Sequence, residues 1–131
     1  MTDREKIREL IAAYALLLDA DDIEGCLGLF TADSEYLVFG KTLLGPDKVR
    51  KMFTRAPRGI HLTGASVITV EGDTASVRTQ VLFVEAGTNV MRPALYDDDL
   101  VKVGGDWRFK RRRCQFLTTA GLSDVPQEQL P

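Results

Sequence analysis

The chain has 131 residues, enough for one ordinary domain and too few for two. Hydrophobic residues make up 44% and charged residues 27% of it, a balance that excludes a disordered protein. The net charge of −2 excludes the basic footprint of a typical nucleic-acid binder, and no apolar run approaches the roughly 18–20 residues that span a bilayer.

The first predicted element is a helix that runs to about Asp19. Thr2 and Glu5 have the spacing of a capping box, in which each side chain satisfies a backbone N–H near the helix start. One apolar stripe at helical period follows, made of Ile7, Leu10, Ile11, Tyr14, Leu17 and Leu18. The acidic segment DADD marks the helix end, and a short second helix is predicted over about 23–30, although two glycines weaken it.

A strand and a third helix are predicted next. The segment EYLVFG, residues 35–40, is rich in strand-forming residues and closes with a glycine. The segment GPDKVRKMF, residues 45–53, opens with Gly-Pro and then carries Val49, Met52 and Phe53 at helical spacing. It therefore predicts a short helix.

Two β-hairpins complete the pattern. Strands rich in Val, Ile, Thr and Phe are predicted over 60–70 and 74–85. Two more are predicted over 90–103 and 106–118, joined by Gly104-Gly105, a strong signal for a tight turn. The order α-α-β-α-β-β-β-β predicts an α+β fold, with the helices packed on one face of a mostly antiparallel sheet.

We expect one domain over residues 1–120, followed by a polar extension over 121–131 that could instead serve as an oligomer arm. The two cysteines, Cys26 and Cys114, show no CxxC or Cys/His spacing, which predicts reduced core thiols. The charged N-terminal segment MTDREKIREL has no apolar stretch of the kind that directs secretion. These features predict a cytoplasmic protein with no membrane partner and no nucleic-acid partner.

The basic run KRRR, residues 110–113, could suggest phosphate binding. A two-residue turn at Gly104-Gly105 instead pairs Asp99 with Lys110, Asp98 with Arg111 and Asp97 with Arg112. Opposite charges that face each other across antiparallel strands stabilise a sheet by roughly 0.2–1 kcal/mol per pair. We therefore interpret the run as structural, while one arginine, either Arg111 or Arg113, could still face a pocket.

The only histidine, His61, lies at the start of a strand otherwise built from apolar residues and threonine. By itself it could be an exposed or hydrogen-bonded imidazole, Tyr14 a core aromatic, and Asp19 a solvated acid at a helix end. A carboxylate beside an imidazole holds its tautomer and raises its basicity, and such a pair can transfer protons near neutral pH.

Strict alternation along 60–70 places His61 on the opposite face from the apolar residues of its hairpin. Those residues are Leu62, Ile68, Val70, Val77, Val81 and Phe83. Only a change of parity brings His61 onto the face that covers the helices. Gly64, in mid-strand, predicts a β-bulge, and bulges re-aim side chains beside active sites.

Four segments together resemble the SnoaL-like branch of the NTF2-like superfamily. They are IRELIAAYALLLDADDIEGCLGLFTADSEY, GPDKVRKMF, GIHLTGASVITVEGDTASV and YDDDLVKVGGDWRFKRR. Relatives include scytalone dehydratase, bile-acid 7α-dehydratase, ketosteroid isomerase and the polyketide cyclases. The resemblance covers about residues 3–118. It implies a cone in which three N-terminal helices pack on a curved sheet around an apolar pocket.

The resemblance also implies site residues. Tyr14, Asp19 and His61 match the positions of the tyrosine, aspartate and histidine that carry the dehydratase reaction. Tyr36 and Tyr96 match places where relatives put pocket tyrosines. We also expect substrate contacts from Phe53 and Arg113. The chain departs from the bile-acid enzyme in having Val84, Phe116 and Gly64 where that enzyme has an acidic residue, an arginine and a polar residue.

Three functions follow from this comparison. The first is a lyase (dehydratase) or isomerase without cofactor or metal, acting on a polyketide-, steroid- or terpenoid-like molecule. The second is a non-catalytic ligand-binding or assembly module, like the β subunits of ring-hydroxylating dioxygenases. The third is a scaffold that keeps the three residues but serves in stress or storage. The resemblance further implies a dimer or trimer formed through the outer sheet face.

Overall fold

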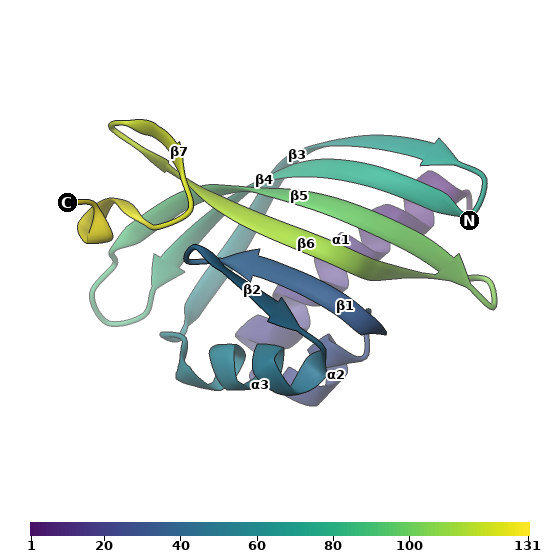
Figure 1. Ribbon diagram of the computed structural model, residues 1–131, viewed down its shortest axis with the longest axis horizontal. Helices are drawn as coiled ribbons and strands as arrows, with labels where there is room; N and C mark the ends of the chain where they lie inside the picture. Colours follow the sequence, from purple (N-terminus) through teal and green to yellow (C-terminus); the bar gives the residue numbers. More distant parts are fainter.

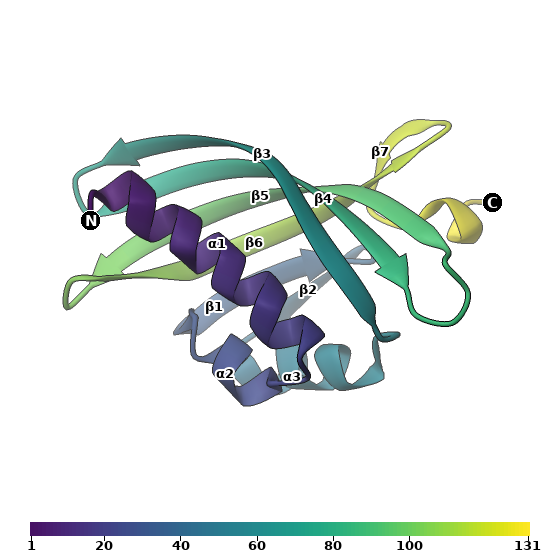
Figure 2. The same cartoon turned by 180° about the vertical axis from the view of Figure 1, so that it is seen from behind.

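The computed structural model describes all residues, 1–131, and begins with the long helix α1, Asp3–Asp19. The predicted capping box is present: the Glu5 backbone N–H donates to Thr2 Oγ1 at 3.2 Å, and the Thr2 N–H donates to Glu5 Oε2 at 2.7 Å. Within the predicted apolar stripe Ile7, Leu10, Ile11 and Tyr14 are buried, while Leu17 and Leu18 are partly buried against the core. This stripe anchors α1 on the sheet (Figures 1 and 2).

The second helix is shorter than the sequence predicts. Helix α2 covers Ile23–Leu27, and the strand β1, Phe30–Val38, begins soon after it. Phe30 is therefore a buried strand residue and not the last turn of a helix. A second short strand that the sequence did not predict, β2 (Lys41–Leu44), pairs with β1 through a turn at Phe39 and Gly40, both with positive φ.

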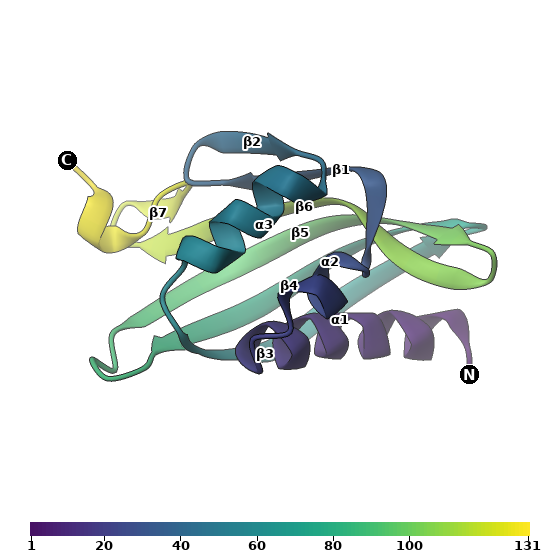
Figure 3. The same cartoon turned by 90° about the horizontal axis from the view of Figure 1, so that it is seen from below.

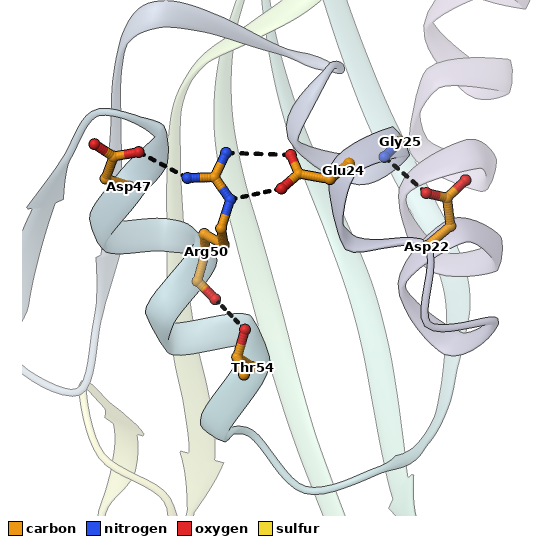
Figure 4. Close-up of polar contacts among 6 residues, drawn as sticks. All are labelled: Asp22, Glu24, Gly25, Asp47, Arg50 and Thr54. Atoms are coloured by element: carbon orange, nitrogen blue, oxygen red, sulfur yellow. Dashed lines mark hydrogen bonds and ion pairs between the residues drawn. The ribbon is translucent and has the colours of Figure 1, made fainter.

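Helix α3, Pro46–Arg55, is tied to α2 by one arginine (Figure 4). The Arg50 guanidinium donates to Glu24 through Nε at 2.7 Å and Nη2 at 3.1 Å, and through Nη1 to Asp47 at 2.7 Å. At the start of α2, Asp22 accepts a hydrogen bond from the Gly25 N–H at 2.9 Å. These contacts hold the two short helices together, and all three helices lie on the same side of the sheet (Figure 3).

The sheet contains seven strands, of which five follow α3. They are β3 (Gly59–Glu71), β4 (Thr74–Glu85), β5 (Met91–Val103), β6 (Asp106–Thr118) and β7 (Gly121–Ser123). The strand order is β2-β1-β6-β5-β4-β3, with β7 paired to β6. Every pairing is antiparallel except β1 with β6. This is the predicted α+β arrangement, with a curved and mostly antiparallel sheet.

The predicted parity change in β3 is confirmed. The pairing of β3 with β4 shifts register between Thr63 and Ser66, on either side of Gly64. As a result His61 turns to the concave face together with its partner Phe83, while Leu62 is half exposed on the outer face. The expectation that Leu62 shares the apolar face with the rest of its hairpin is wrong, because the bulge reverses the alternation.

The predicted register of the last hairpin is wrong by one residue. Pairing follows the expected register from the turn to Leu100 opposite Phe109, and then a bulge shifts it. Beyond the bulge the partners are Asp99 with Arg111, Asp98 with Arg112 and Asp97 with Arg113. The bulge also moves the inward-facing positions, so that Arg112 turns to the core.

The last residues fold back on the chain. After β7, a short 3-10 helix, Gln127–Gln129, follows the fully buried Pro126. The Glu128 side chain accepts a hydrogen bond from Arg92 Nε at 2.5 Å. No helix of the structure is both long enough and apolar enough to span a bilayer.

Candidate active site

A cavity of about 200 Å³ opens between the helices and the concave face of the sheet. Its lining is mostly apolar and comes from the end of α1, from α2 and α3, from five strands and from the C-terminal segment. The side chains in it that can donate or accept a proton include Tyr14, Asp19, Tyr36, His61 and Tyr96. The fold thus gathers five of the six predicted polar site residues around one space.

His61 and Asp19 are in direct contact. The imidazole Nδ1 lies 2.6 Å from Asp19 Oδ1, and the His61 backbone N–H donates to Asp19 Oδ2 at 2.8 Å. Both side chains are 18% exposed, so the pair lies at the cavity wall and is reachable from it. A carboxylate at this distance favours the neutral imidazole with its proton on Nδ1. That tautomer leaves the lone pair of Nε2 free, as a general base requires.

The position of the imidazole is fixed on its other side by Phe83, whose ring centroid is 4.7 Å away. Gly59, at the start of β3, allows this approach: a Cβ there would lie 2.3 Å from the Val84 carbonyl oxygen and 2.7 Å from Cζ of Phe83. Asp19 is the last residue of α1, so the contact between the end of α1 and the start of β3 brings Asp19 and His61 together.

The tyrosines form a connected group beside the pair. The Tyr14 and Tyr36 hydroxyls share a hydrogen bond of 2.8 Å, and the Tyr14 ring centroid lies 5.9 Å from that of Tyr96 and 6.4 Å from that of His61. Burial raises the pKa of all three phenols well above its ordinary value. They therefore stay protonated at neutral pH. One proton of the Tyr14–Tyr36 pair is used in their shared hydrogen bond, so the other hydroxyl of that pair and the Tyr96 hydroxyl are left to donate to a substrate oxygen.

The other two predicted contact residues differ in placement. Phe53, from α3, lines the cavity, and its ring centroid lies 6.0 Å from those of Tyr14 and Tyr36. Arg113 does not line it: this side chain faces the outer side of β6 and pairs with Asp124 at 3.2 Å. The inward position falls to Arg112 because of the bulge, so neither Arg111 nor Arg113 faces the pocket.

Three residues near the cavity were missed by the sequence analysis. Arg112 is fully buried, and Arg92 lines the cavity and pairs with Glu128 of the C-terminal segment. The acidic triplet opposite KRRR was the available signal for Arg112, but only the register decides which pair turns inward. Nothing in the sequence indicated the pairing of Arg92 with Glu128. No group of three or more His, Cys, Asp or Glu side chains is arranged to hold a metal ion.

The cysteines should be inert in the folded protein. Burial raises the pKa of Cys26 and of Cys114 to about 12, so both remain thiols at neutral pH. We expect neither to react with Ellman's reagent at pH 8 until denaturant is added, after which both should react. Rapid reaction of one thiol under native conditions would show that its surroundings open in solution.

The C-terminal segment supplies part of the cavity wall through Pro126, Glu128 and Gln129. We expect a variant lacking residues 121–131 to unfold cooperatively, because the core of α1 and the long strands is complete without them. It should bind a hydrophobic probe such as 2-naphthol several-fold more weakly than the full chain, as measured by NMR titration. Unchanged affinity would mean that the segment does not close the site.

Comparison with known proteins gives a consistent result. A family model described as the SnoaL-like domain matches residues 1–113. A search of curated proteins gave no significant match. Among solved structures, a protein of unknown function from Mycobacterium tuberculosis is 30% identical with a TM-score of 0.81. The match covers 87% of this chain and 71% of that one.

Two structures from Novosphingobium aromaticivorans are also similar. An NTF2-like protein with a cystatin-like fold is 30% identical with a TM-score of 0.77, and the match covers 86% of this chain and 80% of that one. A candidate scytalone dehydratase is 26% identical with a TM-score of 0.78, covering 94% of this chain and 87% of that one. The predicted fold, a cone of helices and curved sheet, is confirmed by these matches.

Proposed function

Since this chain belongs to the SnoaL-like family, we propose that it is a cofactor-independent lyase or isomerase acting on a small hydrophobic oxygenated substrate. The observation that supports this most is the 2.6 Å contact between His61 Nδ1 and Asp19 Oδ1 at the wall of a mostly apolar cavity. A polyketide-, steroid- or terpenoid-like carbon skeleton suits such a lining, because it buries apolar surface and offers few polar atoms.

In the proposed reaction His61 is the general base. Its Nε2 removes the acidic proton α to a substrate carbonyl, and the electrons of the C–H bond form an enolate. In a dehydration the enolate re-forms the carbonyl, and the bond to the β-hydroxyl breaks with its electron pair. The imidazolium then returns its proton to that hydroxyl, so that water leaves. In an isomerisation the same proton is returned to another carbon.

The tyrosines take the second part of the chemistry. Tyr14, together with Tyr36 or Tyr96, would donate a hydrogen bond to the carbonyl oxygen as it gains negative charge. Preorganised donors of this kind lower the barrier because they need no rearrangement when the charge develops. The apolar walls around them, including Phe53 and Phe83, exclude water and strengthen those hydrogen bonds.

The alternative is a non-catalytic ligand-binding or assembly module. A pocket in which His61 and Asp19 do not meet would favour it, and here the two side chains are in hydrogen-bond contact. The enzymatic proposal is therefore preferred. We also propose that the chain forms a dimer or trimer through the outer face of the sheet, where Ile60, Leu62 and Val67 are exposed. Light scattering of the purified chain would give the subunit number.

A substitution at Asp19 tests the proposed proton transfer. Asp19→Asn would present an amide N–H to His61 Nδ1 and so favour the tautomer with its proton on Nε2, which cannot accept a substrate proton. We expect the exchange of the α-protons of 2-tetralone with D2O, followed by NMR, to slow by about 10²–10⁴-fold. Asp47→Asn, an exposed change on α3, is the matched control and should exchange as the wild type does. Equal rates in both variants would contradict the proposal.

A further inference from the structure

Arg112 is the largest fully buried side chain of the protein, and its guanidinium packs against aromatic rings. The Cζ atom lies 3.7 Å from the ring centroid of Tyr96, 4.2 Å from that of Tyr14 and 4.4 Å from that of Phe109. A cation over an aromatic face is attracted by the ring electrons, and the attraction is larger where water is excluded. The charge of Arg112 thus lies directly behind two of the cavity tyrosines.

A single carboxylate holds this guanidinium. Arg112 donates to Asp98 through Nε at 2.7 Å and through Nη2 at 2.9 Å, and both side chains are fully buried. The third nitrogen, Nη1, has no hydrogen-bond partner. Burial alone would lower the pKa of Arg112, but Asp98 holds it well above the ordinary value, so the guanidinium stays a cation. The arrangement fixes the position of the cation toward the rings.

Stability does not explain such a pair. Removing two charges from water costs about as much as, or more than, their mutual attraction returns, and apolar residues of similar volume often stabilise a protein as well or better. The pair also leaves one donor unsatisfied, which is a further cost. We therefore expect the Arg112–Asp98 pair to serve a role in binding or catalysis, and not in the stability of the fold.

The rings under Arg112 carry hydroxyls that border the cavity. Tyr14, Tyr36 and Tyr96 all line it, and the Tyr14 and Tyr36 hydroxyls share a hydrogen bond of 2.8 Å. The charge of Arg112 opposes the rise that burial causes in the pKa of all three phenols. Each O–H is therefore a more polar donor than an equally buried tyrosine without a cation.

The geometry points to Arg112 as a positioning residue that makes the tyrosine end of the cavity, formed by Tyr14, Tyr36 and Tyr96, select for an oxygen that carries negative charge. The chemical class of ligand that follows is an aromatic or enol compound bound as its oxyanion. The inference rests on the proposed function for its role in turnover, but the binding preference itself can be measured without any reaction.

Two probes of nearly the same shape test it. The first probe, 4-nitrophenol, ionises near neutral pH, and its anion is detected by visible absorbance. The second probe is its methyl ether, 4-nitroanisole, which cannot ionise. Titrations are run in the His61→Gln background, so that the imidazole contributes no charge and no turnover. We expect the protein to bind the nitrophenolate form preferentially and thus to lower the apparent pKa of the bound probe.

The variant that removes the cation is Arg112→Met combined with Asp98→Leu, which leaves no unpaired charge in the core. It should lose affinity for nitrophenolate by about tenfold, the effect of one desolvated cation, and keep its affinity for 4-nitroanisole. Equal loss for both probes would assign Arg112 a packing role only, and no loss for either would overturn the inference. If the double variant does not fold, the protein that keeps Arg112 and Asp98 still decides the question. In that protein, a bound nitrophenol that ionises no more readily than the free probe overturns the inference.

Discussion

Replacing His61 with glutamine is expected to abolish most of the proposed proton transfer while the protein stays folded. The exchange of the α-protons of 2-tetralone in D2O should slow by about 10²–10⁴-fold, the contribution of a well-placed general base. The fold should persist because the backbone N–H of residue 61 still donates to Asp19 Oδ2, which needs no imidazole. Thermal unfolding followed by circular dichroism checks that the variant is native.

The control for this variant is Thr69→Ala, a change on the outer face of the same strand, where the side chain is exposed. It should leave the exchange rate and the unfolding temperature as they are in the wild type. If His61→Gln exchanges as fast as Thr69→Ala, the imidazole takes no part in removing the proton, and the enzymatic proposal fails with it.

Replacing Asp98 with asparagine is expected to lower the free energy of unfolding strongly. The substitution removes the only negative charge that holds the fully buried Arg112. Breaking a buried ion pair from one side leaves an uncompensated charge, and such changes lower the free energy of unfolding by about 3–5 kcal/mol. Urea unfolding of the variant at neutral pH measures the loss.

The neighbouring residue gives a matched control, because Asp97 also pairs with an arginine across the sheet. Asp97 lies on the outer face, and its contact with Arg78 at 2.8 Å is open to solvent. Exposed ion pairs contribute little to stability, so Asp97→Asn should unfold close to the wild type. If Asp98→Asn loses as little stability as Asp97→Asn, Arg112 must find another partner, or water, when residue 98 is neutral.

The elements that the sequence predicted well are those with strong local signals. The capping box and apolar stripe gave α1 nearly to the residue, and Gly104-Gly105 gave the last hairpin turn. The second helix was predicted too long because the apolar residues from Leu27 to Phe30 fit a helix or a strand equally well at that length. The pairing of β1 with β2 and β6 resolves that ambiguity.

The candidate site was predicted in outline from the resemblance and only in part from the residues. Tyr14, Asp19, Tyr36, Phe53, His61 and Tyr96 do line one cavity. The bulge at Gly64 was foreseen because the alternation of β3 conflicted with an inward imidazole. The bulge between β5 and β6 was not foreseen, because no glycine or proline marks it. For that reason the sequence analysis expected Arg111 or Arg113, and not Arg112, to face inward.

The sequence by itself determined the local structure: which segments form helices and long strands, where the hairpins turn, and that one imidazole begins a strand. Those properties depend on backbone preferences and on side-chain periodicity over a few residues. Only the tertiary structure decided which side chains meet. Asp19 and His61 come together because α1 packs on the start of β3, and Arg112 faces the core because a bulge of one residue reverses the sides of its strand.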